Sequence, residues 1–517
     1  MSQTLRLLFT VCIFASFFAS CKEENRNPYR DLSIDYFDSI KDSTLSSNSY
    51  EIREWLQTLR KADRDTMYSD NRTQAFYKQT GHSTECFLWI NRHGINPQAH
   101  TLIACLDSCE ADGLHKELFR LDQIHKDIER IEALDFAEDK TDKYYINRIL
   151  ARLEYNLTKA FLKYAVGQRY GFCNPKKILN SLDPYEDDTL NVRFHHLFDV
   201  NMHIAGKETY KEAIDSIRQG KVDSYLRCSQ QKSRTYNLLK EALHKGQFER
   251  DIILLNMERA RWKTEIDADK EKEYVAVNIP SYHLWAVRDG QCVTDMRIGC
   301  GSSKTKTPLL YSRLKRMDIN PKWYIPMSIR KKDMIHHAGS EEYFNSRNYY
   351  AQNKKTGKKL TGSSITYDII TSTDWNIVQE GGNGNALGRI IFRFDNNFAI
   401  YLHDTSTRAF FSRDNRSVSH GCIRVEKPYD LACFMLKNED EEMAERIKYS
   451  MEADLQSDDC DKKKLVWSNK IDPDIALFLY YYTLFPTPGS DVLQRYPDVY
   501  GYDAAIRKAI PELLYHE

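Results

Sequence analysis

The spacing of apolar residues changes once along this 517-residue chain, and the change divides what the chain can fold into. Before about residue 265, apolar residues recur every three or four positions, as in "INRILARLEYNLTKAFLKY" at 146–164, which is typical of a core-facing helix. From about residue 273 they alternate, as in "EYVAVNI" and "YHLWAVRDGQCVTDMRI". We therefore predict an α+β fold, with a helical N-terminal half followed by a mainly β C-terminal half.

Turn residues organise the β half. Asp289-Gly290 separates two alternating runs and predicts a hairpin. Residues 395–397 separate "RIIFRF" from "FAIYLH" in the same way, and a late aromatic strand is expected at 475–485. A charged insert between strands, at about 328–372, is a candidate lid over a site.

The N-terminus carries an apolar run of twelve residues after Arg6, "LLFTVCIFASFF". This run is too short to cross a bilayer but fits the core of a signal peptide. It ends in "FFASC", which resembles the lipobox of bacterial lipoproteins. We expect a signal peptide at 1–20, a lipid on Cys21 and a polar tether at 21–45. The expected location is the cell envelope, with the lipid in the outer membrane and the protein facing the periplasm of a Gram-negative bacterium. The alternative is a plain secretory signal in which this cysteine is incidental.

Charge and cysteine usage exclude some functions. Lys plus Arg and Asp plus Glu both number 74, so the chain lacks the positive excess that nucleic acid binding requires. No CxxC pair or HExxH motif is present, and we expect neither a metal nor a cofactor. Tyrosine is unusually common, with 32 residues. An exported protein can form disulfides, but the spacing of its cysteines does not give their pairing.

The stretch "SVSHGCIRV" at 417–425 holds the candidate chemistry, and fifteen residues separate its Ser419 from His403. A free thiol has a pKa of about 8.5, so a nucleophilic Cys422 needs a nearby base. His403 and His420 are both candidates, and spacing alone does not choose between them. If the stretch is a strand, His420 and Cys422 lie on one side of it. Backbone amides at Gly421–Cys422 could stabilise an oxyanion, and Arg424 could bind a carboxylate.

Each of these residues also has a structural explanation. A buried cysteine is commonly a small hydrophobic residue, His403 could be a core histidine, and Arg424 could form a surface ion pair. The full pattern of histidine, serine, histidine, glycine, cysteine and arginine is long, however, and chance occurrence is rare.

This pattern, His403 followed by Ser419-His420-Gly421-Cys422-Ile423-Arg424, resembles the signature of the L,D-transpeptidase (YkuD-type) family. The stretches "NMERARWKTE", "NPKWYIP", "GNALGRIIFRF" and "RYPDVYGYDAAIRKAI" resemble the large branch of that family that carries a scaffold. The resemblance implies Cys422 as nucleophile and His403 as general base. His420, Ser419, Gly421 and Arg424 would form the oxyanion hole and orient the substrate.

The same resemblance implies an activity and a domain layout. The expected activity is 3→3 cross-linking of peptidoglycan stem peptides through a cysteine thioester, with release of D-Ala. Carbapenem-type inhibitors are expected to acylate the thiol. The layout is a helical scaffold at 46–265 and a catalytic domain at 266–517, with the insert as a capping subdomain. The branch often has a wall-binding module, but its glycine-containing motif is missing from 175–255, where a degenerate or replaced module is expected.

Three other readings stay open. The same site could act as an L,D-carboxypeptidase if water replaces the acceptor amine. The catalytic domain could be silent, leaving a tethered wall-binding scaffold. A cysteine peptidase or amidase of another fold would need the cysteine at a helix N-terminus, whereas here it follows a strand-like stretch.

Overall fold

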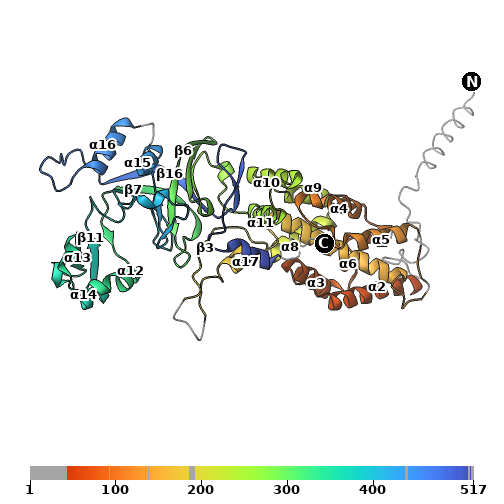
Figure 1. Ribbon diagram of the computed structural model, residues 1–517. Helices are drawn as coiled ribbons and strands as arrows, with labels where there is room; N and C mark the ends of the chain where they lie inside the picture. Colours follow the sequence, from red (N-terminus) through yellow and green to blue (C-terminus); the bar gives the residue numbers. More distant parts are fainter. Residues whose placement is uncertain are drawn as a thin grey trace, which may run out of the picture.

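A computed structural model describes residues 43–91, 94–133, 135–137, 139–185, 192–436, 440–510 and 513. The expected signal peptide, the lipid site at Cys21 and nearly all of the tether lie outside these residues. In the part of the chain that is described, no helix is long and apolar enough to cross a membrane. Figure 1 shows an elongated molecule with a helical bundle at one end, a strand-rich domain in the middle and a small domain at the far end.

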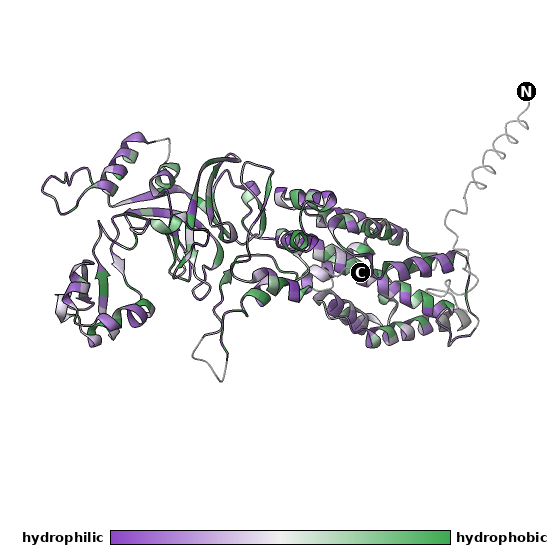
Figure 2. Ribbon diagram, viewed as in Figure 1, coloured by the Kyte–Doolittle hydropathy of each residue, from purple (hydrophilic) through white to green (hydrophobic). Residues whose placement is uncertain are grey.

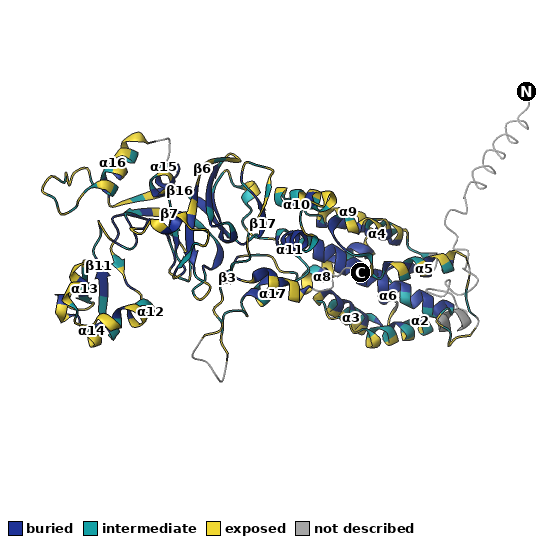
Figure 3. Ribbon diagram, viewed as in Figure 1, coloured by how far each residue is buried: buried dark blue, intermediate teal, exposed yellow. Residues whose placement is uncertain are grey.

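Helices make up the N-terminal half, as the sequence predicts. The central helix, α6 (Ile146–Tyr170), is buried along most of its length, so the apolar stripe is only one part of its buried surface (Figure 3). Polar residues on α6 are buried with partners: the Glu154 carboxylate accepts hydrogen bonds from the Leu88 and Trp89 amides at 2.9 Å. The other helices of this half are α2 (Ser43–Ala62), α3 (Tyr68–Thr80), α4 (Pro97–Asp107), α5 (Leu121–Glu132), α7 (Pro175–Leu179), α8 (Lys207–Arg218), α9 (Val222–Ser229), α10 (Arg234–Lys245) and α11 (Arg250–Arg261).

The C-terminal half contains a ring of hydrogen-bonded strands in the order β12-β13-β15-β6-β5-β4-β16-β7, which closes because β12 also pairs with β7. The predicted hairpin at Asp289-Gly290 is confirmed: it joins β5 to β6, and both residues have positive φ, at 48° and 75°. The strands are β4 (Glu273–Asn278), β5 (His283–Arg288), β6 (Gln291–Gly301), β7 (Leu309–Ile319), β12 (Ile390–Phe394), β13 (Leu402–His403), β15 (Ile423–Val425) and β16 (Ser468–Tyr480), with β14 (Ser417–Ser419) paired to β6.

The charged insert is a small domain with a sheet of its own, in the order β10-β9-β11-β8. Met334, Phe344 and Ile365 belong to a hydrophobic core that is separate from the main one. The chain enters and leaves this capping domain at one place, where Lys322 forms an ion pair with Glu380 at 2.6 Å. Its elements are β8 (Trp323–Tyr324), α12 (Met327–Ile329), α13 (Glu341–Asn345), β9 (Tyr349–Asn353), β10 (Lys359–Thr361), α14 (Tyr367–Thr371) and β11 (Trp375–Gln379).

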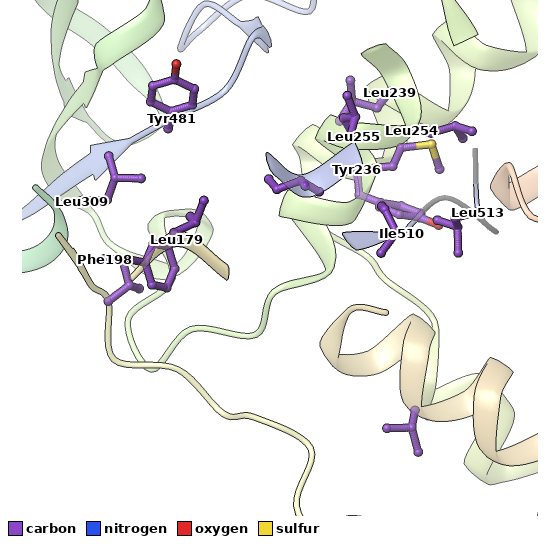
Figure 4. Close-up of a cluster of buried hydrophobic side chains, with 14 of the residues drawn as sticks. Leu179, Phe198, Tyr236, Leu239, Leu254, Leu255, Leu309, Tyr481, Ile510 and Leu513 are labelled. Carbon is purple, nitrogen blue, oxygen red and sulfur yellow. The ribbon is translucent and has the colours of Figure 1, made fainter. Parts of the chain in front are cut away.

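The scaffold and the ring of strands share one hydrophobic core. The helical half contributes β3 (Phe198–Asp199), which pairs Phe198 with Leu309 of β7, and the late helix α17 (Tyr502–Ala509) packs back on α11. Figure 4 shows Phe198 and Leu309 near each other at this junction. The range 175–255, where a degenerate wall-binding module is expected, supplies α8 to α11 to this same core. Hydrophobic residues lie on the inward faces of the bundle and hydrophilic ones outside (Figure 2).

Two predicted strands differ from the structure. The strand expected at 398–403 is reduced to Leu402–His403, because Ala399 has a φ of 51° and interrupts the extended backbone. The strand expected at 475–485 begins earlier, at Ser468, and ends at Tyr480. After it, the Thr483 amide donates to Asn256 of the scaffold, and a separate strand β17 (Leu484–Pro486) pairs with β18 (Leu493–Arg495).

Candidate active site

Parallel pairing of β13 with β15 brings the two distant motifs together. Leu402 is the register partner of Ile423, and His403 is the partner of Arg424. The ladder continues one residue earlier, where the Ile423 amide donates to the Tyr401 carbonyl at 2.9 Å. Leu402 and Ile423 point into the core. Because side chains alternate along strands, His403 and Arg424 share the opposite face. Cys422 directly precedes β15, and its thiol is close enough to Arg424 to feel the charge of the guanidinium.

The motif around Cys422 is not one continuous strand. β14 ends at Ser419 and β15 begins at Ile423, and the chain bends between them at Gly421, whose φ is 115°. Such a backbone conformation is nearly restricted to glycine. The expectation that His420 and Cys422 lie on one side of a strand is therefore wrong, since the bend separates them.

Ser419 holds this bend closed. It is 4% exposed, and its hydroxyl donates to the Cys422 carbonyl at 2.5 Å and accepts from the Gly421 amide at 3.1 Å. The Gly421 amide is thus already occupied. Among the described residues, no acceptor bonds the Cys422 amide, so this amide is the better candidate for binding an oxyanion. Ser419 positions the nucleophile's backbone, a role that the sequence motif alone did not give.

His403 is positioned as a neutral base. Its imidazole is 4% exposed, and Nδ1 donates to the Asp404 carbonyl at 2.5 Å. Burial is the main reason why the pKa of His403 falls to about 4, and the positive charge of Arg424 lowers it further. Backbone hydrogen bonds with Asp404 and Leu387 act in the opposite direction but do not offset burial. Near neutral pH the ring is uncharged and able to take a proton.

The Asp404 carboxylate has a different task. It accepts a hydrogen bond from the Arg389 amide at 2.8 Å and forms an ion pair with Arg408 at 3.2 Å. Only the backbone of Asp404 orients the imidazole. The Asp404 carboxylate is therefore not placed as the acid of a catalytic triad.

The positive charge of Arg424 also acts on the thiol of Cys422. The thiol is partly buried against the core, and burial raises its pKa, while a backbone hydrogen bond from Tyr401 and the charge of Arg424 act to lower it. Burial also lowers the pKa of Arg424. Its Nε is buried without a hydrogen-bond partner, and the guanidinium lies 5.6 Å from the Phe410 ring centre. No carboxylate in the described part of the chain pairs with Arg424. Such a cation fits an incoming carboxylate.

His420 lies apart from this group. Its side chain is 45% exposed, and Nε2 is 3.8 Å from the Asp333 carboxylate of the capping domain. Of the two histidines, His403 is the buried one and lies on the strand that pairs with β15. Residues 419–422 are here called the nucleophile loop, and the capping domain reaches this loop through Asp333.

Residues 305–307, which follow β6, form hydrogen bonds with the nucleophile loop. Thr305 donates to the Ser419 carbonyl and Thr307 to the Gly421 carbonyl, both at 2.9 Å. The Thr307 amide in turn donates to the Tyr500 hydroxyl at 3.1 Å. Tyr500 lies in the stretch "RYPDVYGYDAAIRKAI", which the sequence singled out for its resemblance to the family. The sequence pattern alone could not assign Thr307 as the partner of Tyr500.

Metal and disulfide chemistry have no candidates in the described part of the chain. No group of three or more His, Cys, Asp or Glu side chains there could hold a metal ion. The ten cysteines from Cys86 to Cys460 are all free thiols in this structure.

Two models of known protein families match this chain. Residues 272–441 match the model of the L,D-transpeptidase catalytic domain (YkuD), and residues 71–243 match the model of the scaffold domain. The chain carries an L,D-transpeptidase catalytic domain. His403, the nucleophile loop and Arg424 all lie within it, and the scaffold match extends into the range 175–255.

Individual relatives of this L,D-transpeptidase domain resemble only parts of the chain. A Haemophilus influenzae protein assigned by name to the L,D-transpeptidases is 33% identical over 235 residues, which are 46% of this chain and 45% of that protein. The match thus spans about half the length of that relative. An L,D-transpeptidase structure from Mycobacterium smegmatis has 13% identity and a TM-score of 0.18, covering 32% of this chain and 54% of the other. One from Enterococcus faecium has 11% identity and a TM-score of 0.17, covering 50% and 71%.

Proposed function

We propose that this protein is a peptidoglycan L,D-transpeptidase that forms 3→3 cross-links through a thioester on Cys422. The observation that carries the proposal is the β13–β15 pairing inside the matched catalytic domain, which makes His403 and Arg424 register partners and brings Cys422, directly before β15, to the same place. A neutral imidazole with a fixed ring, a thiol and an unpaired guanidinium are the groups that acyl transfer from a peptide carrying a carboxylate requires.

The proposed first step acylates the enzyme. His403 takes the thiol proton of Cys422, and the sulfur attacks the carbonyl of the third residue in a stem tetrapeptide. The Cys422 amide donates to the oxyanion that forms. The bond to D-Ala breaks, its nitrogen takes the proton from His403, and a thioester remains. Arg424 holds a carboxylate of the donor peptide.

The second step decides between two products of one site. If the side-chain amine of a second stem peptide attacks the thioester, a 3→3 cross-link forms and the thiol is restored. If water attacks, the product is a tripeptide and the enzyme acts as an L,D-carboxypeptidase. The approach of Asp333 of the capping domain to His420 supports the first outcome, since a cap that closed over this loop in the acyl-enzyme would exclude water.

The test uses the full chain with a purified disaccharide-tetrapeptide. Mass spectrometry is expected to find free D-Ala and cross-linked dimers, and Cys422→Ala is expected to yield neither. Tripeptide without dimers would show that the site acts as an L,D-carboxypeptidase. Absence of all products from a correctly folded protein would favour a silent wall-binding scaffold. A carbapenem is expected to add its mass to the wild type and not to Cys422→Ala.

The proposal for location rests on the sequence alone. We propose that Cys21 carries a lipid after removal of residues 1–20, which anchors the protein in the outer membrane facing the periplasm. Fractionation of cells that express the full chain tests this. Cys21→Ala is expected to move the protein from the membrane to the soluble fraction, and an unchanged distribution would contradict the anchor.

A further inference from the structure

Arg389 lies directly before β12, in the segment through which the chain returns from the capping domain. Its amide donates to the Asp404 carboxylate at 2.8 Å, and the Asp404 amide donates to the carbonyl of Ile390 at 2.9 Å. The Asp404 carbonyl in turn accepts the hydrogen bond from Nδ1 of His403. Residues 389–390 therefore hold the residue whose backbone orients the imidazole.

The residues before Arg389 also lie close to the base. Gly388 has a φ of 68°, and a Cβ at this position would be 2.5 Å from side-chain atoms of Asp404, so only glycine fits here. The backbone of Leu387 forms one of the two hydrogen bonds that act on the pKa of His403. The Leu387 amide is held by the Asn385 side chain at 2.8 Å. The segment 387–389 is thus packed along the residues that fix the ring.

The guanidinium of Arg389 ties this segment to a helix outside the ring of strands. Nε donates to the Met451 carbonyl at 2.6 Å and Nη2 to the Ala453 carbonyl at 2.5 Å. These carbonyls are at the C-terminal end of α16 (Glu441–Glu452), where the partial negative charge of a helix favours a cation. Among the described residues Arg389 forms no ion pair, so neutral acceptors hold its charge.

The third anchor of the guanidinium is Asn320, at the entry to the capping domain. Nη1 donates to the Asn320 side-chain oxygen at 2.9 Å, and the Asn320 amide donates back to the Arg389 carbonyl at 2.7 Å. Asn320 is 4% exposed, and its Nδ2 donates to the Ser450 carbonyl of α16 at 2.6 Å. One side chain therefore joins the two strands of the cap's neck to the end of α16.

The position of this arginine separates it from one that serves stability alone. Its backbone holds Asp404, and its side chain spans three anchors that no shorter or unbranched side chain could reach together. Loss of those anchors would free residues 387–389 to move, and the carbonyl that orients the ring of His403 would move with them.

We infer that Arg389 is a positioning residue for the base: its guanidinium fixes residues 387–389 and, through Asp404, the orientation of His403. Arg389 itself touches neither the thiol nor the substrate in this mechanism. The inference rests on the proposed function where it concerns the rate of acyl transfer. The effect on the imidazole does not depend on turnover.

The first test compares Arg389→Gln and Arg389→Lys in the full chain by kcat/KM for D-Ala release across pH. Both variants are expected to lose about tenfold to a hundredfold in rate, because the base is misplaced. Water that reaches the loosened ring reduces the burial that lowers the pKa of His403, so the acid limb of the profile is expected to move to higher pH. Lysine keeps the charge but not the fork, and it is expected to behave as glutamine does.

Arg288→Gln is the matched control. Arg288 is also half-buried, and it ties β5 to the last carbonyl of another helix, α15 (Pro428–Phe434), at 3.0 Å. Its loss is expected to lower stability without moving the acid limb. Arg424 and Cys422, the titratable groups that face the ring from the β15 side, are unchanged in all three variants.

The second test follows the imidazole without substrate. In protein carrying ¹³C-labelled histidine, the ring signal that is missing in His403→Gln belongs to His403. It is expected to titrate near pH 4 in the wild type and at higher pH in both Arg389 variants. An unmoved titration in folded variants, or a lysine variant that matches the wild type, would overturn the inference. A moved titration in a protein that releases no D-Ala would support the positioning of His403 and reject the proposed function.

Discussion

His403 and Arg424 are register partners across the parallel strands β13 and β15, so a cation faces the imidazole from the neighbouring strand. The charge of Arg424 lowers the pKa of His403 and also acts on the thiol of Cys422 to lower its pKa. One guanidinium therefore keeps the base neutral and favours the thiolate. A substrate carboxylate on Arg424 would weaken both effects at the moment of binding.

Removal of either reacting group is expected to abolish acyl transfer. Cys422→Ala lacks the sulfur, and His403→Gln lacks the base, which is expected to lower the rate of D-Ala release by about 10²–10⁴ fold. His420→Gln is the control, because its side chain is exposed and faces Asp333. Initial rates with the disaccharide-tetrapeptide measure all three. A larger loss in His420→Gln than in His403→Gln would reverse the assignment of the base.

Stability is expected to fall as the pH drops from about 6.5 to about 4. In that window the unfolded chain protonates His403 at its usual pKa, whereas the folded protein resists protonation down to about 4. The unfolded state therefore binds more protons in this window, and protonation stabilises it relative to the folded state. Thermal unfolding across this range measures the slope, and His403→Gln is expected to make it shallower. An unchanged slope in that variant would show that other groups cause the dependence.

Gly421→Ala is expected to destabilise the nucleophile loop. A Cβ added at this position would have enough space, because the nearest atom, Ile400 Cγ2, would be 3.5 Å away. The loss in the free energy of unfolding, about 1–3 kcal/mol, therefore comes from the φ of 115°. The rate of thiol acylation is expected to fall with it. Gly357→Ala serves as a control, because it lies at φ 71° in an open turn of the capping domain. Equal effects on unfolding midpoint and acylation in both variants would contradict a special role for this bend.

The capping domain is expected to control the fate of the thioester. Replacing residues 323–379 with a short glycine linker should leave the rest folded, because Lys322 and Glu380 already meet and the cap has its own core. The expected product shift is from dimers to tripeptide, since water then reaches the thioester. Chromatography of the products measures the ratio. An unchanged ratio in a folded deletion variant would remove the cap from the mechanism.

A buried charge network in the scaffold is expected to be critical for folding. Lys159 is 3% exposed and forms ion pairs with Asp63 and Asp65, both at 2.6 Å. Lys159→Met would leave Asp63 buried without this partner, at a cost of about 3–5 kcal/mol in the free energy of unfolding. Lys270→Met, at an exposed position, is the control. Denaturant titration distinguishes them, and a loss below 1 kcal/mol for Lys159→Met would contradict the argument.

Some of this protein could be predicted from local pattern alone. The change of period near residue 273 separated helices from strands, Asp289-Gly290 located a hairpin, and the motif from His403 to Arg424 contained the candidate chemistry. These features are local, because side-chain periodicity and turn propensity depend on neighbours in the chain. The same local reasoning extended the strand at 398–403 too far, since nothing in an alanine residue indicates the positive φ that Ala399 has.

Only the tertiary structure decided where the two histidines lie. His420 is two residues from Cys422 yet lies beside Asp333, while His403, nineteen residues away, is on the strand that pairs with β15. Support of the nucleophile loop likewise needs Thr307 and Tyr500, which are far apart in the chain, to meet. Such contacts are set by the register of strands and by the packing of the two halves. Neither is encoded in the spacing of residues along the chain.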